Sequence, residues 1–217
     1  MNATAQMTVK PFHAIIAMEN PQNHPSVLIA EEFEKEDVLY KTTTQSKANR
    51  DAESLARCAV LLLGICEEIQ LVDPHFDITQ RKCSETFLEI LAARKSAPQR
   101  LRVLEIHTKR SDAFSRATQE SHYRKHVERL IPAGTTLRVH FWSEGTGGEK
   151  PHPRFLLSEF GGLQFDYGLD AGDGPGDTTI VTLMDQTLWQ TVRTDYSCPS
   201  PSFSISDDCI IDIRGRS

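Results

Sequence analysis

The pattern of apolar and polar positions divides the chain into a short β-rich beginning and a longer α/β part. Apolar runs at 12–16 and 27–29 lie on either side of a strong turn signal, Asn20-Pro21-Gln22-Asn23-His24-Pro25. From about Asn49 the spacing typical of helices alternates with the spacing typical of strands. The pattern predicts three parts, a lead-in packed on the main domain, the main domain and a tail: 1–48, 49–195 and 196–217.

The middle of the chain repeats an order of helix followed by strand. The segments with apolar residues at helical spacing are 51–68, 85–95 and about 111–130. The short apolar runs that alternate with them, and read as strands, are 69–72, 101–106 and 137–142. Strands connected through helices run parallel. We therefore expect an α/β fold with a mostly parallel, mixed sheet flanked by helices on both faces.

The last third of the chain has a different pattern. Gly161-Gly162 separates two short apolar runs and indicates a hairpin. The aspartate-rich stretch 170–177 predicts an exposed loop, and Asp185 is placed to cap a short helix. The tail from Cys198 is rich in serine and proline before it alternates weakly, so it adds one strand or contacts a partner.

The candidate chemistry lies between His152 and Glu159, in the order His-Pro-Arg-Phe-Leu-Leu-Ser-Glu. Side chains two apart on a strand share a face, so His152 and Arg154 are predicted to point the same way. An imidazole beside a permanent cation is suited to attack on phosphorus while the cation neutralises the phosphoryl oxygens. Gly168 and Asp170 follow as candidate substrate-binding residues.

Composition and charge limit the class of protein. The chain has 217 residues, of which 39% are hydrophobic and 25% are charged, with a formal net charge of −6. This charge argues against a surface that binds polyanions everywhere, and it leaves room for a local basic groove. Five cysteines without a C-x-x-C pair indicate reduced thiols. No signal-peptide pattern is visible, and the longest apolar run, Ala59–Ile65, is too short to span a bilayer. A cytoplasmic protein without a membrane partner is expected.

The order of elements, together with His152-x-Arg154-x-x-x-x-Glu159, resembles one unit of the phospholipase D superfamily. That family carries the motif H-x-K-x-x-x-x-D. The chain is most similar to bacterial stand-alone relatives in which arginine replaces the lysine and a Gly-Leu-Asp follows, here Gly168-Leu169-Asp170. The resemblance covers roughly residues 50–190.

The resemblance implies a role for each matching residue. His152 corresponds to the nucleophile that forms a phosphohistidine, Arg154 to the phosphate-binding lysine, and Glu159 to the aspartate that supports the histidine. Gly168 and Asp170 stand near the family's later glycine and polar residue. The family's mechanism needs no metal or other cofactor. It requires two motifs that face each other, and this chain has one, so the implied assembly is a homodimer.

Two functions follow from this resemblance, and a third is unrelated to it. The first is a metal-independent phosphodiesterase, a nuclease in particular, because a chain without a membrane segment has little access to lipids. The second is an inactive relative that binds or regulates within a bacterial multi-protein system, such as phage defence, with partners from the same operon. Arg154 and Glu159, in place of the family's lysine and aspartate, favour the second, and the intact His152 favours the first. The third is an α/β small-molecule binder in which the histidine spacing is accidental.

Several other residues have two interpretations each. Asp73 and Asp77 flank Pro74 after a predicted parallel strand, where α/β proteins bind ligands, although both could instead cap a helix. His122 and His126 are four apart on a predicted basic helix. They could pair on a metal, or their helix could follow a phosphate backbone or simply be solvated.

Overall fold

The computed structural model describes residues 14–32, 43–95, 97, 100–109, 114–143, 152–205 and 210–215. It divides into two compact units, Met1–Thr44 and Gln45–Ser217. In the first unit, β1 (Ile15–Ala17) and β2 (Val27–Ile29) pair in parallel. The Asn20 side chain accepts a hydrogen bond from the backbone N–H of His24 (2.8 Å) and donates one to its carbonyl (3.0 Å). The turn predicted between the two apolar runs is therefore present.

The described residues of the second unit form one sheet of eight strands and five helices. The strands are β3 (Gln45–Asn49), β4 (Glu68–Val72), β5 (Val103–Lys109), β6 (Thr136–Trp142), β7 (Phe155–Ser158), β8 (Gly162–Phe165), β9 (Thr178–Leu183) and β10 (Ile210–Arg214). The helices are α2 (Ala52–Cys58), α3 (Val60–Ile65), α4 (Arg81–Lys95), α5 (Arg116–Val127) and α6 (Gln186–Asp195).

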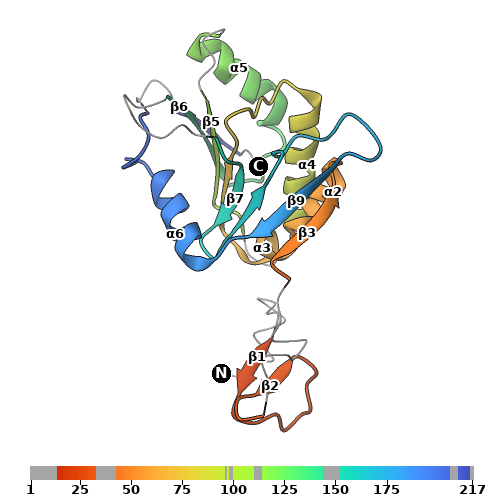
Figure 1. The fold of residues 1–217 in the computed structure, drawn as a ribbon. Coiled ribbons are helices and arrows are strands. Elements are labelled where there is room, and N and C mark those ends of the chain that lie inside the picture. Colours follow the sequence, from red (N-terminus) through yellow and green to blue (C-terminus); the bar gives the residue numbers. More distant parts are fainter. Residues whose placement is uncertain are drawn as a thin grey trace. The chain divides into compact units, whose positions relative to one another are not determined.

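The sheet has the order β10-β6-β5-β4-β7-β8-β9-β3 (Figure 1). The α/β class is confirmed, but the prediction of a mostly parallel sheet is wrong. Within this sheet, β4–β5 and β5–β6 are the parallel pairs among the described strands, and the other pairs are antiparallel. Part of the physical reason is the length of the connections. Helical crossovers join β4, β5 and β6 and allow parallel pairing, whereas the three residues between β7 and β8 allow only an antiparallel hairpin.

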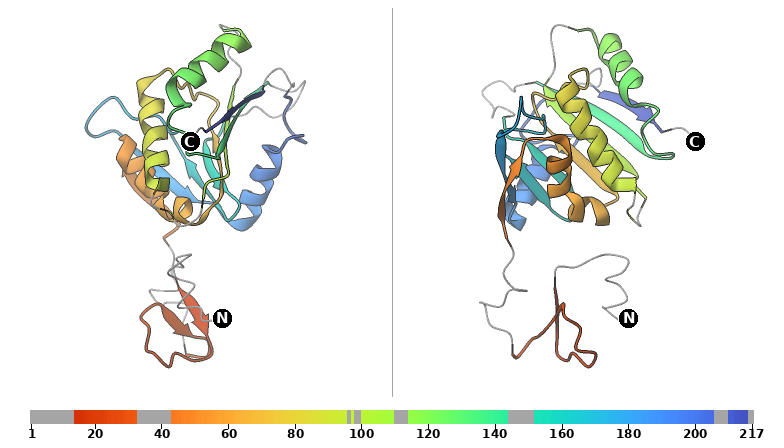
Figure 2. Two further views of the ribbon diagram at one scale, coloured as in Figure 1. Left: turned by 180° about the vertical axis from the view of Figure 1, so that it is seen from behind. Right: turned by 90° about the vertical axis from the view of Figure 1, so that its right-hand side faces the viewer.

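Helices cover both faces of the sheet, as predicted. Figure 2 shows α2 and α4 on one face and α6 on the other. Successive strand residues alternate between two separate hydrophobic clusters, so Leu71 and Leu156 pack on the α4 face while Val72 and Leu157 pack on the α6 face. Because helices cover both faces, the central strand β7 is buried along its whole length.

The helix boundaries differ from the predicted ones for local reasons. The helix predicted at 51–68 is divided at Ala59, whose backbone N–H bonds to carbonyls in the last turn of α2. The third helix begins at Arg116, because the Ser115 hydroxyl accepts the N–H of Thr118 as its N-cap. Residue 111, where this helix was predicted to begin, lies outside the described residues. Asp185 caps α6 as predicted.

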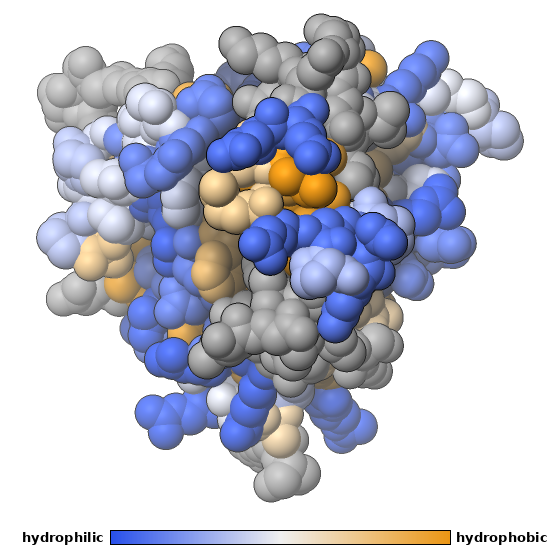
Figure 3. Space-filling model, turned by 90° about the horizontal axis from the view of Figure 1, so that it is seen from below, coloured by the Kyte–Doolittle hydropathy of each residue, from blue (hydrophilic) through white to orange (hydrophobic). Residues whose placement is uncertain are grey.

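Large hydrophobic side chains are also found at the surface, among them Met18, Leu61 and Tyr167. In Figure 3, hydrophobic side chains are visible at the surface among hydrophilic ones. Among the helices that the structure describes, none combines the length and the apolar character needed to cross a bilayer.

Candidate functional site

One candidate site lies where β4 ends and β7 begins. These strands are antiparallel neighbours, and Val72 pairs with Phe155. The next residues, Asp73 after β4 and Arg154 before β7, therefore lie side by side at the same end of the sheet. Arg154 Nε lies 3.9 Å from Asp73 Oδ1, and the two side chains are 20% and 4% exposed. The structure thus brings together two residues that the sequence analysis had assigned to different motifs.

Asp73 holds two loops in place at this end of the sheet, the one after β4 and the one after β8. Its Oδ1 accepts the backbone N–H of His75 (2.9 Å) and its Oδ2 accepts that of Leu169 (3.3 Å). Burial raises the pKa of the Asp73 carboxyl above its ordinary value, although these two hydrogen bonds and the charge of Arg154 oppose the rise. Asp73 therefore shapes both loops, and it also lies beside Arg154.

Gly168 and Asp170 belong to the same place. Gly168 has φ +93°, and a Cβ built there would lie 2.7 Å from Asp73 Oδ2 and 3.5 Å from Arg154 Cγ. Only glycine accommodates this conformation and this approach without strain. Asp170 Oδ2 accepts a hydrogen bond from the guanidinium of Arg50 at 2.9 Å. We call Arg50, Asp73, Arg154, Gly168 and Asp170 the Arg154 site.

In the Arg154 site, the guanidinium groups of Arg50 and Arg154 each have an N–H donor without an acceptor among the described residues. Arg154 donates through NH1 to the Asp166 carbonyl only at 3.4 Å, and its buried Nε has no hydrogen-bond partner within the described part of the chain. The buried Nε of Arg50 likewise has none there. Buried donors without acceptors are costly, and planar guanidinium groups bind phosphoryl oxygens well. The arrangement therefore suits an oxyanion ligand.

Arg50 was not foreseen from the sequence. It directly follows β3, which pairs with β9 at the far edge of the sheet, and nothing in the local pattern marks it. Its guanidinium carbon also lies 5.1 Å from the centre of the exposed Tyr167 ring. Only the folded chain shows that Arg50 reaches Asp170, which lies 120 positions later in the sequence.

His152 and Glu159 are separated by the whole of β7. The His152 side chain is exposed, two residues before Arg154, and forms no hydrogen bond or ion pair with any residue that the structure describes. Glu159 lies at the opposite end of the strand, where its carboxylate accepts the backbone N–H groups of Glu67 (2.6 Å) and Glu68 (3.2 Å). Four strand residues span roughly 13 Å. The structure therefore does not bring Glu159 to His152, and the partner of Arg154 is Asp73.

Asp77 is apart from the Arg154 site. Its Oδ1 accepts the backbone N–H of Thr79 (2.9 Å) and the Thr79 hydroxyl (2.7 Å), and its Oδ2 accepts the Gln80 amide (3.3 Å). Burial alone would raise the pKa of Asp77, but these hydrogen bonds outweigh it and lower the pKa. Of the two interpretations, the geometry matches a carboxylate that shapes the turn before α4.

Asp77 also lines a cavity of about 230 Å³ at the carboxyl ends of β4, β5 and β6. Its walls include four aromatic rings and two imidazoles: Phe76, Phe114, Tyr123 and Phe141, with His75 and His122. His126 is exposed on α5 and is not part of the cavity wall.

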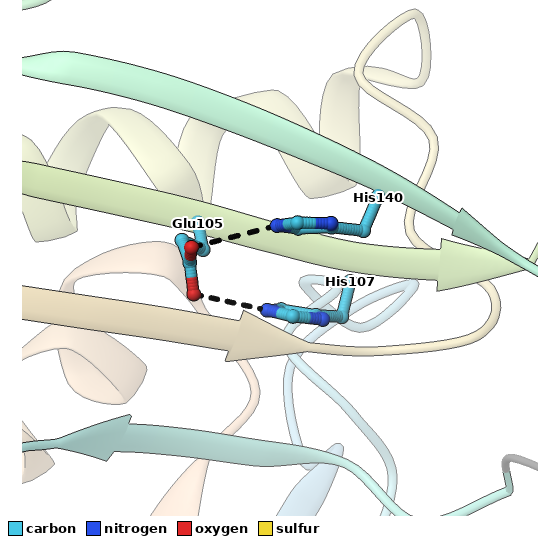
Figure 4. A group of neighbouring side chains, drawn as sticks. All are labelled: Glu105, His107 and His140. Carbon is cyan, nitrogen blue, oxygen red and sulfur yellow. Dashed lines mark hydrogen bonds and ion pairs between the residues drawn. The ribbon is translucent and has the colours of Figure 1, made fainter. Parts of the chain in front are cut away.

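A second group of polar residues is buried within the sheet itself. Glu105 and His107 come from β5 and His140 comes from the neighbouring β6 (Figure 4). The Nε2 atoms of His107 and His140 each lie 3.4 Å from a different oxygen of Glu105. Both histidine side chains are 1% exposed. The carboxylate also accepts the Gln70 amide at 2.7 Å.

The arrangement of this cluster does not suit a metal ion. The two imidazole rings are stacked, with centroids 4.5 Å apart and planes inclined by 14°, so the Nε2 lone pairs run side by side and do not converge (Figure 4). Trp142 Nε1–H donates to His107 Nδ1 at 2.9 Å. This bond places the proton of neutral His107 on Nε2, towards Glu105, whereas a metal ligand would need a lone pair there.

The cluster instead holds an ionised carboxylate between two imidazoles. Burial lowers the pKa of His107 to about 4, even though Glu105 opposes that change. Burial alone would raise the pKa of Glu105, but hydrogen bonds from His107 and His140 outweigh it and lower the pKa. The sequence analysis missed this cluster. A usable signal was the acidic residue inside an apolar strand, followed two positions later by a histidine on the same face.

Comparisons with known proteins give little further information. No family model matches the chain, and no curated protein matches it. Among solved structures, a similar chain is TrmBL2, described as an archaeal chromatin protein with a novel mode of DNA binding. The match has 13% identity and a TM-score of 0.34, and it covers 73% of this chain and 51% of that one. The chain thus spans about half the length of TrmBL2. A likeness of this size carries no argument about activity.

Proposed function

We propose that the chain is a metal-independent phosphodiesterase of the phospholipase D type, acting on nucleic acid, with His152 as the nucleophile. One observation carries the proposal. Arg154 is held against Asp73 with a buried Nε–H that has no acceptor among the described residues, two positions from an exposed imidazole. A phosphodiester oxygen at Arg154 would satisfy this donor and place the phosphorus near His152.

The chemistry requires a second proton-transfer group. A nitrogen of His152 attacks phosphorus and forms an N–P bond while the P–O bond to the leaving group breaks. The departing oxygen takes a proton from a second histidine, and water then hydrolyses the N–P bond and regenerates His152. We propose that this second histidine is His152 of another copy, in a homodimer with the site on its two-fold axis.

A second candidate function is supported by Glu159. In this chain its carboxylate is occupied by the N–H groups of Glu67 and Glu68, and no described carboxylate orients His152. An imidazole without this support is a poorer nucleophile. The alternative is therefore an inactive, phosphate-binding relative that serves as a component of a larger bacterial system. A cytoplasmic location is part of both proposals.

The two candidates are separated by one assay in the presence of a chelator. The substrates are bis(4-nitrophenyl) phosphate and labelled single- and double-stranded DNA and RNA. The variants are His152→Ala and Arg154→Gln, with His126→Ala as the matched control, because His126 is an exposed histidine away from the Arg154 site. The phosphodiesterase predicts turnover that His152→Ala abolishes and His126→Ala leaves unchanged. Nucleic-acid binding without turnover, weakened by Arg154→Gln alone, would establish the alternative. If His152→Ala retained full activity, the proposed mechanism would be wrong.

A further inference from the structure

The cavity of about 230 Å³ beside α5 has the composition of a site for a flat ring. Its volume is below the roughly 300–1,000 Å³ of pockets for drug-sized ligands, so a single ring system fits it better than an extended molecule. The aromatic side chains Tyr123 and Phe141 are buried in its wall. Such faces favour a planar partner, because stacked and edge-to-face contacts between rings are stabilising.

The mouth of the cavity presents groups that would interact with a ring from two sides. Phe114 lies there, and 48% of it is exposed. Its ring meets His122 edge to face, with the centroids 5.4 Å apart. The imidazoles of His75 and His122 supply ring nitrogens at the rim. A heterocycle with both a π-face and polar edges would contact all of these groups, whereas an aliphatic ligand would form no hydrogen bond with the imidazoles.

The cavity is connected to the Arg154 site through Asp73. One oxygen of Asp73 lies 3.9 Å from Arg154 Nε, and the same oxygen accepts the N–H of His75, which lines the cavity. At no more than about 3.6 Å per residue, the two residues from Asp73 to His75 span at most about 7 Å. Both sites also lie at the carboxyl ends of parallel strands, where α/β sheets bind their ligands.

We propose that this cavity binds the base of a nucleotide whose phosphate lies at Arg154. This inference rests on the proposed function in one respect, namely that the Arg154 site binds phosphate. It adds a second contact, which would let the protein select nucleotides over other phosphate esters. Phe114 stacks on the base, and His75 and His122 hydrogen-bond to its edge. The cavity thus makes the protein prefer nucleotide substrates to simple phosphodiesters.

The test measures binding by titration calorimetry with three probes, which are inorganic phosphate, nucleoside monophosphates and the same nucleosides without phosphate. The variants are Phe114→Ala and His122→Ala for the cavity, Arg154→Gln for the phosphate site and His126→Ala as the control on α5. Phe114 is half exposed, so its removal leaves the core intact, and thermal unfolding verifies the fold of each variant. We expect Phe114→Ala to weaken nucleotide binding about tenfold and to leave phosphate binding unchanged.

The outcomes distinguish the two proposals. If Arg154→Gln removes phosphate binding but Phe114→Ala and His122→Ala leave nucleotide affinity as in the wild type, the cavity inference is wrong and the phosphate site stands. If Arg154→Gln leaves phosphate binding unchanged, the proposed function fails at its first step. A wild-type protein that binds nucleotides no more tightly than phosphate would also overturn the inference.

Discussion

At the scale of the residue, Gly168 shows how one position without a side chain lets a site form. Asp73 and Arg154 both pack over it, and its backbone lies at φ +93°. Any other residue there must adopt a left-handed conformation and displace the carboxylate that holds Arg154 in place. The glycine is therefore needed both for the fold of the loop and for the geometry of the Arg154 site.

We expect Gly168→Ala to destabilise the protein by about 1–3 kcal/mol, because it combines backbone strain with a contact of 2.7 Å to Asp73 Oδ2. Urea unfolding measures the loss, and calorimetry should show weaker phosphate binding. Gly174→Ala is the control. A Cβ at Gly174 meets no heavy atom within 4 Å, so its effect should stay within about 0.5 kcal/mol. Equal stabilities for the two variants would contradict this account of Gly168.

At the scale of the element, the sequence predicted those features that depend on local periodicity. The helices α4 and α5 and the strands β4, β5 and β6 follow from apolar spacing, and the hairpin of β7 and β8 follows from Gly161-Gly162. Features that depend on distant pairing were missed. β3 pairs with β9 and belongs to the second unit, which begins at Gln45, four residues before the predicted boundary at 49. β10, the one strand that the tail was expected to add, pairs with β6.

The residues of the candidate site also divide into those that the local sequence predicts and those that only distant pairing brings together. Arg154 was selected from the histidine motif and Gly168 and Asp170 from the stretch that follows it, and the structure places them together. Arg50 and the stacking of His107 on His140 depend on strand order and register, which no local pattern encodes. Even so, once β5 and β6 are aligned, His107 and His140 become direct neighbours across the two strands.

This pairing of β5 with β6 predicts a dependence of stability on pH. The pKa of His107 is lowered to about 4 in the folded protein, from 6.5. Between these two values the unfolded chain binds more protons than the folded one, so stability falls as the pH falls. From about pH 7 to about pH 5 the loss should be about 2 kcal/mol. Glu105, whose pKa is also lowered, adds to the loss only at lower pH.

Urea unfolding at the two pH values measures this change. His107→Gln keeps an oxygen that can accept the Trp142 N–H but removes the titrating group, so its stability should change much less between the two pH values. His152→Ala removes an exposed imidazole and should retain the wild-type slope. A His107→Gln variant with an unchanged slope would show that another group is responsible.

At the scale of the whole molecule, the proposed mechanism needs two histidine motifs, and this chain supplies one. The net charge of −6 disfavours a broad basic surface, so under the proposed function a local arrangement of cations would bind the anionic substrate. Arg50 and Arg154 form such an arrangement at one edge of the sheet, and His152 is exposed beside it. An exposed edge with a single imidazole is compatible with a partner copy that supplies the second.

A mixing experiment tests this assembly through activity. Wild-type protein is incubated with an equal amount of His152→Ala until subunits exchange at random. If each site needs two copies of His152, only wild-type homodimers remain active, and about half of the initial activity is retained. If each chain works independently with its own histidine, the activity stays unchanged, as it should when an unrelated protein replaces the variant. Sedimentation equilibrium at micromolar concentration checks the same premise independently, because a chain that remains a monomer there cannot form a site from two copies of one histidine.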